Sequence, residues 1–136
     1  MKRFIVISFL LGGIFLVSGC GERSCESGAK VGAPWDQLQL PIVAGGEVCF
    51  SYDNMLGIVH YGAAPFELIH KYQEALQSSG WQVDSEPAPS GSDMRFLRAV
   101  KGEKKLSVSS AACTRNPLAQ LFSKCGLVQF SPSTAP

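Results

Sequence analysis

The feature that most constrains the fold is one amphipathic helix, which the sequence predicts over residues 65–79. Its apolar stripe recurs at helical spacing and consists of Leu68, Ile69, Tyr72 and Leu76. Pro65 suits the first turn because its missing N–H would have no partner there. Gly80 is the expected left-handed cap residue, and Trp81 can then fold back onto the last turn in a Schellman-type contact. The stripe predicts that this helix packs on a second layer.

Short segments of alternating apolar and polar residues on both sides of the helix predict strands. The expected strands are 48–52 and 58–61 before the helix, then one that begins at Trp81, and then 94–100, 104–112 and 126–130. An exposed loop is expected at 86–92, and a longer excursion with a short helical turn at 114–124. Strands segregated around one helix predict an α+β fold, with a mostly antiparallel β-sheet packed against that helix.

The first twenty residues are typical of a targeting segment. Lys2 and Arg3 precede an uncharged run over residues 4–17, and small residues follow. This order is that of a secretory signal peptide. A run of 14 residues is short for a transmembrane helix, which needs about 20. An uncleaved N-terminal anchor is the alternative.

Val17-Ser18-Gly19-Cys20 resembles the lipobox of bacterial lipoproteins, in which cleavage falls just before a lipidated cysteine. The resemblance implies a signal peptide over residues 1–19 and a covalent lipid on Cys20. Two or three acyl chains give near-permanent membrane attachment. Gly21 stands where enteric lipoproteins retained in the inner membrane carry Asp. The resemblance therefore implies a cell-envelope protein, with the outer membrane favoured if the host has one.

Length and charge exclude several classes of function. The chain has 136 residues, which favours one domain. Its formal net charge of +1 becomes −1 when Lys2 and Arg3 leave with the leader. A nucleic-acid binder shows a clear basic excess, so nucleic acid is not an expected partner. The expected organisation is a lipidated N-terminus and tether over 20–46, whose latter half docks loosely, a single domain over 47–131 and a disordered tail over 132–136.

Five cysteines are present, and four remain when Cys20 is reserved for lipid. An exported chain lies in an oxidising compartment, so two disulfides are expected and three connectivities are possible. The preferred pairing is Cys113–Cys125 between the last two strands, and Cys25–Cys49 between the tether and the first strand. The spacing lacks the tight ligand pairs of a structural metal site. No cofactor is expected beyond the lipid on Cys20.

A second resemblance covers residues 58–105. The pattern Tyr72-x-x-x-Leu76-x-x-x-Gly80-Trp81, followed by a Lys101-Gly102 turn, resembles small secreted or lipid-anchored bacterial proteins. Residues in such a pattern cap the helix and pack in the core. The resemblance therefore implies a fold and carries over no catalytic residue.

Candidate catalytic groups are few, and no catalytic residue is assigned. His60 and His70 are the only histidines, and both are expected at least partly exposed on the surface. His70 could pair with Glu67 on the same helical face. Without a nucleophile or a third group, that pair is not a site. The serines around Ser109 are better explained as one wet face of a strand.

One predicted hairpin carries a lopsided charge from Arg95, Arg98, Lys101, Lys104 and Lys105, with Glu103 as its acid. If Arg98 shares a face with Lys104 or Lys105, this hairpin forms a basic ridge that could dock an acidic partner, glycan or lipid headgroup. The alternative is a solvated edge hairpin that lysines protect from aggregation.

The resulting hypothesis is a non-enzymatic, lipid-anchored envelope protein that binds an envelope protein or polymer. The alternatives are a small envelope hydrolase, or an inhibitor of an exogenous hydrolase.

Overall fold

The computed structural model describes residues 25–86, 94–114 and 124–133. The expected leader with Cys20, most of the expected loop and excursion, and the last three residues lie outside the described residues. Within the described ranges, no helix is long and apolar enough to cross a membrane.

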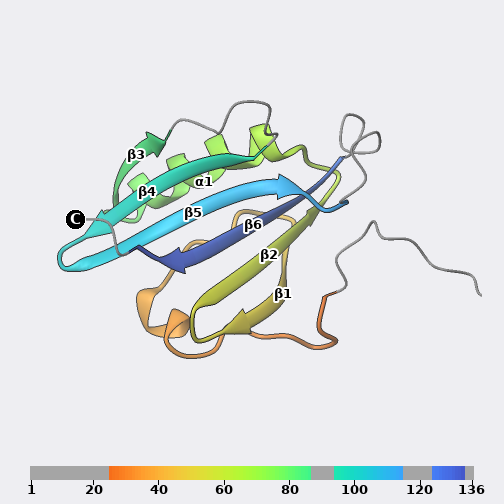
Figure 1. Ribbon diagram of the computed structural model, residues 1–136, viewed down its shortest axis with the longest axis horizontal. Helices are drawn as coiled ribbons and strands as arrows, with labels where there is room; N and C mark the ends of the chain where they lie inside the picture. The colour runs from red at the N-terminus through yellow and green to blue at the C-terminus, as the bar shows by residue number, and fades with distance from the viewer. Residues whose placement is uncertain (1–24, 87–93, 115–123, 134–136) are drawn as a thin grey trace, which may run out of the picture.

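The described strands form one antiparallel sheet, which confirms the expected fold class (Figure 1). They are β1 (Gly46–Tyr52), β2 (Met55–Tyr61), β3 (Gln82–Glu86), β4 (Arg95–Lys101), β5 (Lys104–Ala112) and β6 (Cys125–Pro132). Their order across the sheet is β1-β2-β6-β5-β4-β3. The last strand therefore lies inside the sheet, where it joins the N-terminal hairpin to the other three strands.

Helix α1 (Pro65–Ser78) ends one residue earlier than expected, and its cap is the predicted one. Gly80 has a φ of +89°, which an L side chain rarely adopts. The N–H of Trp81 donates to the carbonyl oxygen of Leu76 at 3.0 Å, and that of Gly80 donates to Gln77 at 3.1 Å. These two bonds define the Schellman motif. The apolar stripe is buried against β3, β4, β5 and β6.

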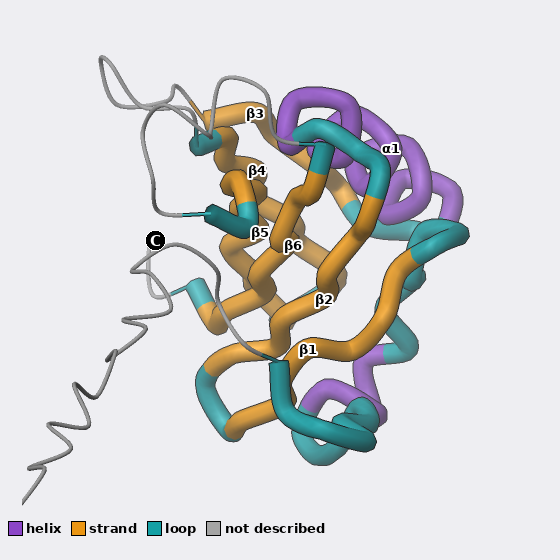
Figure 2. Tube along the Cα trace, turned by 90° about the vertical axis from the view of Figure 1, so that its right-hand side faces the viewer, coloured by secondary structure: helices purple, strands orange, loops and turns teal. Residues whose placement is uncertain are grey.

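A second cover on the α1 side of the sheet comes from residues 25–45, here called the N-terminal segment (Figure 2). This segment starts at Cys25 on the opposite side of the sheet and packs on the α1 side from Val31 onward. Its regular part is a 3-10 helix, η1 (Trp35–Leu38). Trp35 is 1% exposed and belongs to the same core cluster as Leu56 of β2 and Phe130 of β6. The expectation of loose docking is therefore wrong for this part of the chain, and the core extends upstream of residue 47.

Both expected disulfides are present, Cys25–Cys49 and Cys113–Cys125. They lie on the opposite side of the sheet from α1, here called the open face, where they pack with Val59 and Leu127. An irregularity in the β1–β2 register between Val48 and Phe50 places Cys49 at a bulge. A bulge lets two successive side chains share a face, and both Cys49 and Phe50 belong to this open-face cluster.

Candidate functional site

The N-terminal segment encloses an apolar pocket of about 230 Å³ against the sheet. The pocket is lined by Val31, Trp35, Asp36, Gln39, Leu40, Pro41, Ile42, Leu56 and Phe130. Leu56 and Phe130 come from β2 and β6, and the remaining seven come from the N-terminal segment. The site therefore depends on an irregular segment that packs on regular strands.

Two local features hold the wall of the pocket in place. The indole Nε1–H of Trp35 donates to the carbonyl oxygen of Tyr52 at 2.5 Å, which ties η1 to the end of β1. Gln39 has a φ of +49°, a left-handed conformation that strains a residue with a Cβ. Strain of this kind persists only where the surroundings determine the backbone, and ligand clamps are one such setting.

The volume of the pocket limits what it can hold. An apolar cavity of about 150 Å³ takes a benzene ring, and pockets for drug-sized ligands measure about 300–1,000 Å³. A pocket of about 230 Å³ lies between these values and fits one aromatic or branched aliphatic group. The side chains of Asp36 and Gln39 are the polar groups of the lining, and both residues are exposed. The arrangement suits an apolar group that enters past a polar rim.

His60 is buried between the sheet and α1 and does not lie on the surface. It is 2% exposed, and its Nε2 atom is 2.7 Å from the hydroxyl oxygen of Tyr72 in a buried hydrogen bond. The expectation of a partly exposed His60 is wrong, because β2 lies inside the sheet and residue 60 faces α1. Burial lowers the pKa of His60, and the charge of Lys71 lowers it further. His60 is therefore a neutral structural group at neutral pH.

Tyr72 joins this buried pair to the floor of the pocket. Its ring meets that of Phe130 in a T-shaped contact, with centroids 5.7 Å apart. Burial raises the pKa of Tyr72 far above its usual value, while a backbone hydrogen bond with Val43 acts in the opposite direction. Neither His60 nor Tyr72 lines the pocket. Their bond connects β2 to α1 and does not present an acid or base to a bound molecule.

The second histidine is exposed, as expected. The ring of His70 lies edge-on to that of Phe66, with centroids 4.9 Å apart. Glu67 is also exposed, and no hydrogen bond or ion pair between Glu67 and His70 occurs in the described part of the chain. Across the three described ranges, no three His, Cys, Asp or Glu side chains gather as metal ligands would.

The basic residues of the β4–β5 hairpin do not share one face. Register places Arg98 opposite Ser107 and Lys105 opposite Val100, so Arg98 and Lys105 lie diagonally on the open face. Lys101 and Lys104 face each other across the end of the hairpin, on the other side. A basic ridge requires that Arg98 share a face with Lys104 or Lys105, and only Lys105 lies on the same face as Arg98. The docking role of the five residues remains a prediction.

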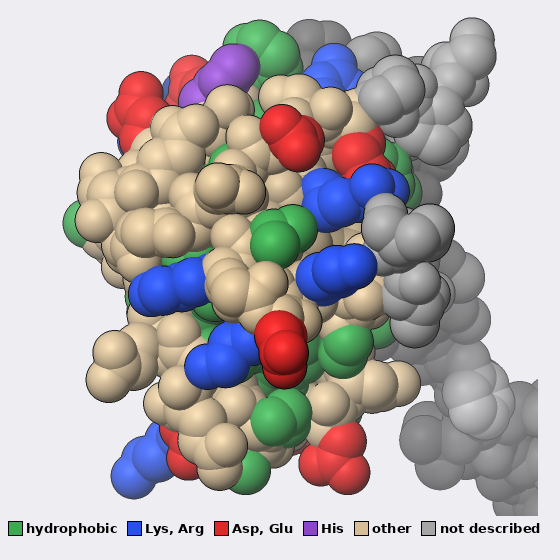
Figure 3. All heavy atoms as spheres, turned by 90° about the vertical axis from the view of Figure 1, so that its left-hand side faces the viewer, with side chains coloured by type: hydrophobic (Ala, Val, Ile, Leu, Met, Phe, Trp, Pro, Cys, Tyr) green, Lys and Arg blue, Asp and Glu red, His purple; other side chains and the backbone are tan. Residues whose placement is uncertain are grey.

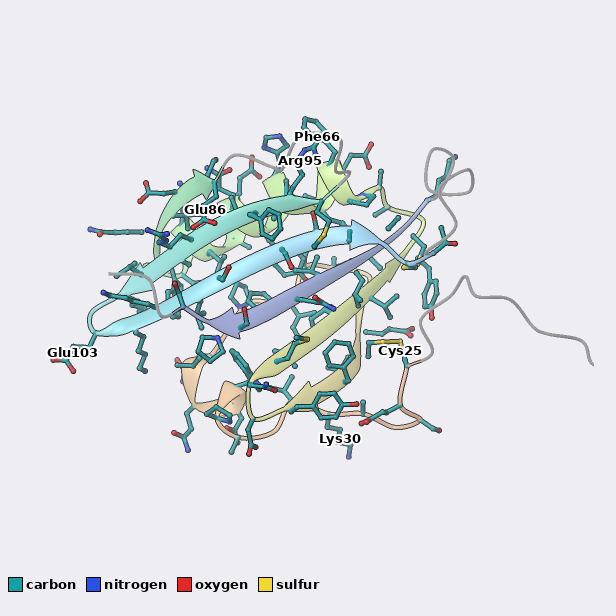
Figure 4. The ribbon with its side chains drawn as sticks, in the orientation of Figure 1. Cys25, Lys30, Phe66, Glu86, Arg95 and Glu103 are labelled. Carbon is teal, nitrogen blue, oxygen red and sulfur yellow. A yellow bond between two sulfur atoms is a disulfide. The ribbon has the colours of Figure 1, made fainter. Side chains whose placement is uncertain are left out.

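Several of these cations already have partners. Nε of Arg98 lies 3.0 Å from a carboxylate oxygen of Glu86. Nζ of Lys101 donates to the carbonyl oxygen of Ser79 at 2.8 Å, which satisfies a group at the end of α1. The guanidinium of Arg95 lies 5.7 Å from the ring centre of Phe66, at the opposite end of the hairpin from Glu103 (Figure 4). Figure 3 shows basic groups separated by acidic and neutral ones rather than one continuous patch.

The pocket is the feature that sequence reasoning missed. The signal was the presence of large apolar residues, Trp35 above all, in a segment otherwise typical of a tether. A tryptophan that is buried needs neighbours, but its spacing from the other apolar residues matches neither a helix nor a strand. The floor residue Phe130 lies far away in sequence, so the pocket could not be assembled from local patterns.

No protein-family model, curated protein or solved structure matches this chain.

Proposed function

We propose that this chain is a lipid-anchored protein of the cell envelope that binds a partner protein and catalyses no reaction. The supporting observation is the cysteine pairing. Cys25 pairs with Cys49 and Cys113 with Cys125, so Cys20 is left with no cysteine of its own chain to pair with. An odd cysteine after a basic and apolar leader is what lipidation requires.

The apolar pocket supports a protein partner over a polysaccharide. Its lining is mostly hydrophobic, and its size suits one apolar side chain. Buried anchors of this kind supply most of the energy of many protein interfaces. A sugar ring would bring several hydroxyl groups into a pocket whose polar side chains, Asp36 and Gln39, are both exposed.

The hydrolase alternative receives no comparable support. It could use Glu67 and His70 or an unidentified cleft, and those two residues lie on the exposed surface of α1 and do not line the pocket. An inhibitor of an exogenous hydrolase belongs to the binding class and would use the same pocket. The identity of a captured partner separates an inhibitor from an adaptor.

The test is crosslinking of the full-length protein in intact cells, followed by mild-detergent purification and mass spectrometry. The same sample gives the mass of the Cys20 peptide. Ile42 lines the pocket and is 43% exposed, so Ile42→Asp puts a charge where the partner's apolar side chain would enter. Phe66→Asp changes an apolar residue on α1 that is 58% exposed and does not line the pocket, and it is the matched control. We expect Ile42→Asp to reduce partner recovery about tenfold or more, and Phe66→Asp to leave it unchanged.

Two results would contradict the proposal. A Cys20 peptide without lipid would remove the anchor. Partner recovery that survives Ile42→Asp but falls after charge reversal at Lys101, Lys104 and Lys105 would move the binding surface from the pocket to the β4–β5 hairpin.

A further inference from the structure

The short connection between Cys20 and the folded part of the chain limits how the protein can stand on a membrane. Cys25 is held to Cys49 of β1 by a disulfide, and the N–H of Glu26 donates to the carbonyl oxygen of Cys49 at 2.8 Å. The fold is therefore fixed from residue 25 onward. The five Cα-to-Cα steps from Cys20 to Cys25 span at most about 17 Å.

This reach is shorter than the molecule is wide. A chain of this size folds to a radius of gyration of about 13 Å, so its far side lies roughly 30 Å from its near side. A lipid on Cys20 would keep Cys25 close to the headgroups and would hold the opposite surfaces away from them. Figure 4 places Cys25 at the other end of the molecule from Glu103 at the hairpin tip.

The open face of β1 and β2 carries two exposed tyrosines above buried cysteine and valine side chains. The bulged strand β1 places Cys49 and Phe50 on the open face, beside Val59 of β2. Tyr52 stacks on Phe50 with ring centroids 5.3 Å apart and is 48% exposed. Tyr61 follows Val59 by two residues, so it lies on the same face of β2, and it is 68% exposed. The hydroxyl of Tyr52 donates to a carboxylate oxygen of Glu26 at 2.5 Å. Exposed tyrosines, which combine an apolar ring with a polar end, are typical of the membrane–water interface.

We propose that the open face of β1 and β2 rests on the bilayer that holds the Cys20 lipid, with Tyr52 and Tyr61 among the headgroups. This inference depends on the lipidation in the proposed function. The contact between the open face and the lipids can be weak on its own, because a short tether keeps the two surfaces at an effective concentration on the order of millimolar. Glu26 and Glu47 are exposed at the same edge, so the surface suits zwitterionic rather than anionic lipids.

This orientation has a consequence for the pocket. Residues 31–45 of the N-terminal segment and α1 lie on the other side of the sheet from the open face (Figure 2). A protein resting on its open face would direct the pocket side away from the bilayer. A partner could then reach Ile42 without contact with the lipids.

The test places a tryptophan on each side of the sheet in the lipidated, full-length mature protein. Tyr61→Trp reports on the open face, and Phe66→Trp, at a residue 58% exposed on α1, is the matched control. The native Trp35 and Trp81 are both buried and give a constant background. The protein is inserted into phosphatidylcholine vesicles whose acyl chains carry bromine near the headgroup, which quenches nearby tryptophan. Tyr52→Trp is a second open-face reporter if Tyr61→Trp does not fold.

We expect bromine to quench the open-face tryptophan at least about twice as strongly as the one at position 66. Equal quenching at the two positions, or stronger quenching at position 66, in protein whose Cys20 lipid is verified by mass would overturn the membrane contact and leave the proposed function standing. Absence of quenching at both positions would have the same meaning and would direct the open face toward a protein partner. A Cys20 without lipid would overturn both proposals.

Discussion

The two covers on the sheet are held in different ways. Helix α1 presents a regular apolar stripe and ends in a Gly80 cap, so many small contacts fix it. The N-terminal segment contains one short 3-10 helix, and a single large side chain, Trp35, anchors it within the core. A disulfide upstream adds a covalent tie. An aperiodic segment can thus close a sheet face around one anchor, and it leaves a pocket where a helix would pack fully.

The largest expected loss of stability is at Trp35. We expect Trp35→Ala to lower the free energy of unfolding by about 3–5 kcal/mol, because it removes a buried indole and leaves a cavity. Leu76→Ala, on the helix side, should lower it by about 2–5 kcal/mol. Urea denaturation of both variants measures the effect. A loss of less than about 1 kcal/mol for Trp35→Ala would show that the N-terminal segment is not part of the cooperative core.

Removal of a disulfide should give the next largest loss in the free energy of unfolding. Cys25–Cys49 closes a separation of 24 residues and Cys113–Cys125 one of 12. Replacing both cysteines of a bridge by serine should cost about 3.5 and about 3 kcal/mol respectively in the chain-entropy model. Hydrogen exchange should rise mainly in the N-terminal segment when the first bridge is lost, while α1 keeps its protection. A uniform rise across both covers would mean that they do not open separately.

The hydrogen bond between His60 and Tyr72 joins β2 of the sheet to α1. Tyr72→Phe removes the hydroxyl and leaves a buried imidazole nitrogen without this partner, which should cost about 1–2 kcal/mol. Thermal unfolding followed by circular dichroism measures the cost. A variant as stable as the parent would mean that water replaces the lost hydroxyl.

Each cover ends at a glycine with a positive φ, so alanine substitutions there compare the backbone strain of the two turns. Gly80 ends α1 with a φ of +89°, and Gly45 ends the N-terminal segment with a φ of +86°. A Cβ at Gly45 would meet no atom within 4 Å, and one at Gly80 would make ordinary contact with the end of the Lys101 side chain at 3.6 Å, so alanine tests mainly backbone strain. We expect each substitution to lower the free energy of unfolding by about 1 kcal/mol. A silent Gly45→Ala beside a costly Gly80→Ala would show that the segment relaxes where the helix does not.

The pH dependence of stability should show the buried histidine. The pKa of His60 is lowered in the folded protein, so the unfolded chain, with a value of about 6.5, takes up the proton first as the pH falls. Its contribution is complete above about pH 6.5 and is lost as the pH falls through the lowered folded value. His60→Gln should reduce this dependence of the free energy of unfolding on pH, in denaturation measured from pH 8 to 5.

The helix side of the fold was predictable because its signals are local. The stripe of α1, the Gly80 cap and the strands β4 and β5 all follow from spacing within a few residues. The disulfide pairing was predicted from the even number of cysteines left after Cys20 and from the expected closeness of the last two strands. Each of these inferences needed little long-range information.

The N-terminal segment and its pocket were not predictable in the same way. Trp35 contacts the sheet through β1 and β6, so its burial is decided by the tertiary packing. His60 resembled a surface residue because β2 was not expected to have β6 along one side and α1 across its face. The five basic residues lie close in sequence, but the alternation of side chains along β4 and β5 divides them between two faces.

The two edges of the sheet have consequences for self-association. Along β1, the backbone of Glu26 and the Cys25–Cys49 bridge occupy part of the edge that another strand would need. The opposite edge, β3, has five residues and carries the carboxylates of Asp84 and Glu86. An unprotected edge strand is a template for aggregation, and short length and charge are the usual defences. Two copies that met along β3 would bring their Asp84 carboxylates together, which disfavours pairing along this edge.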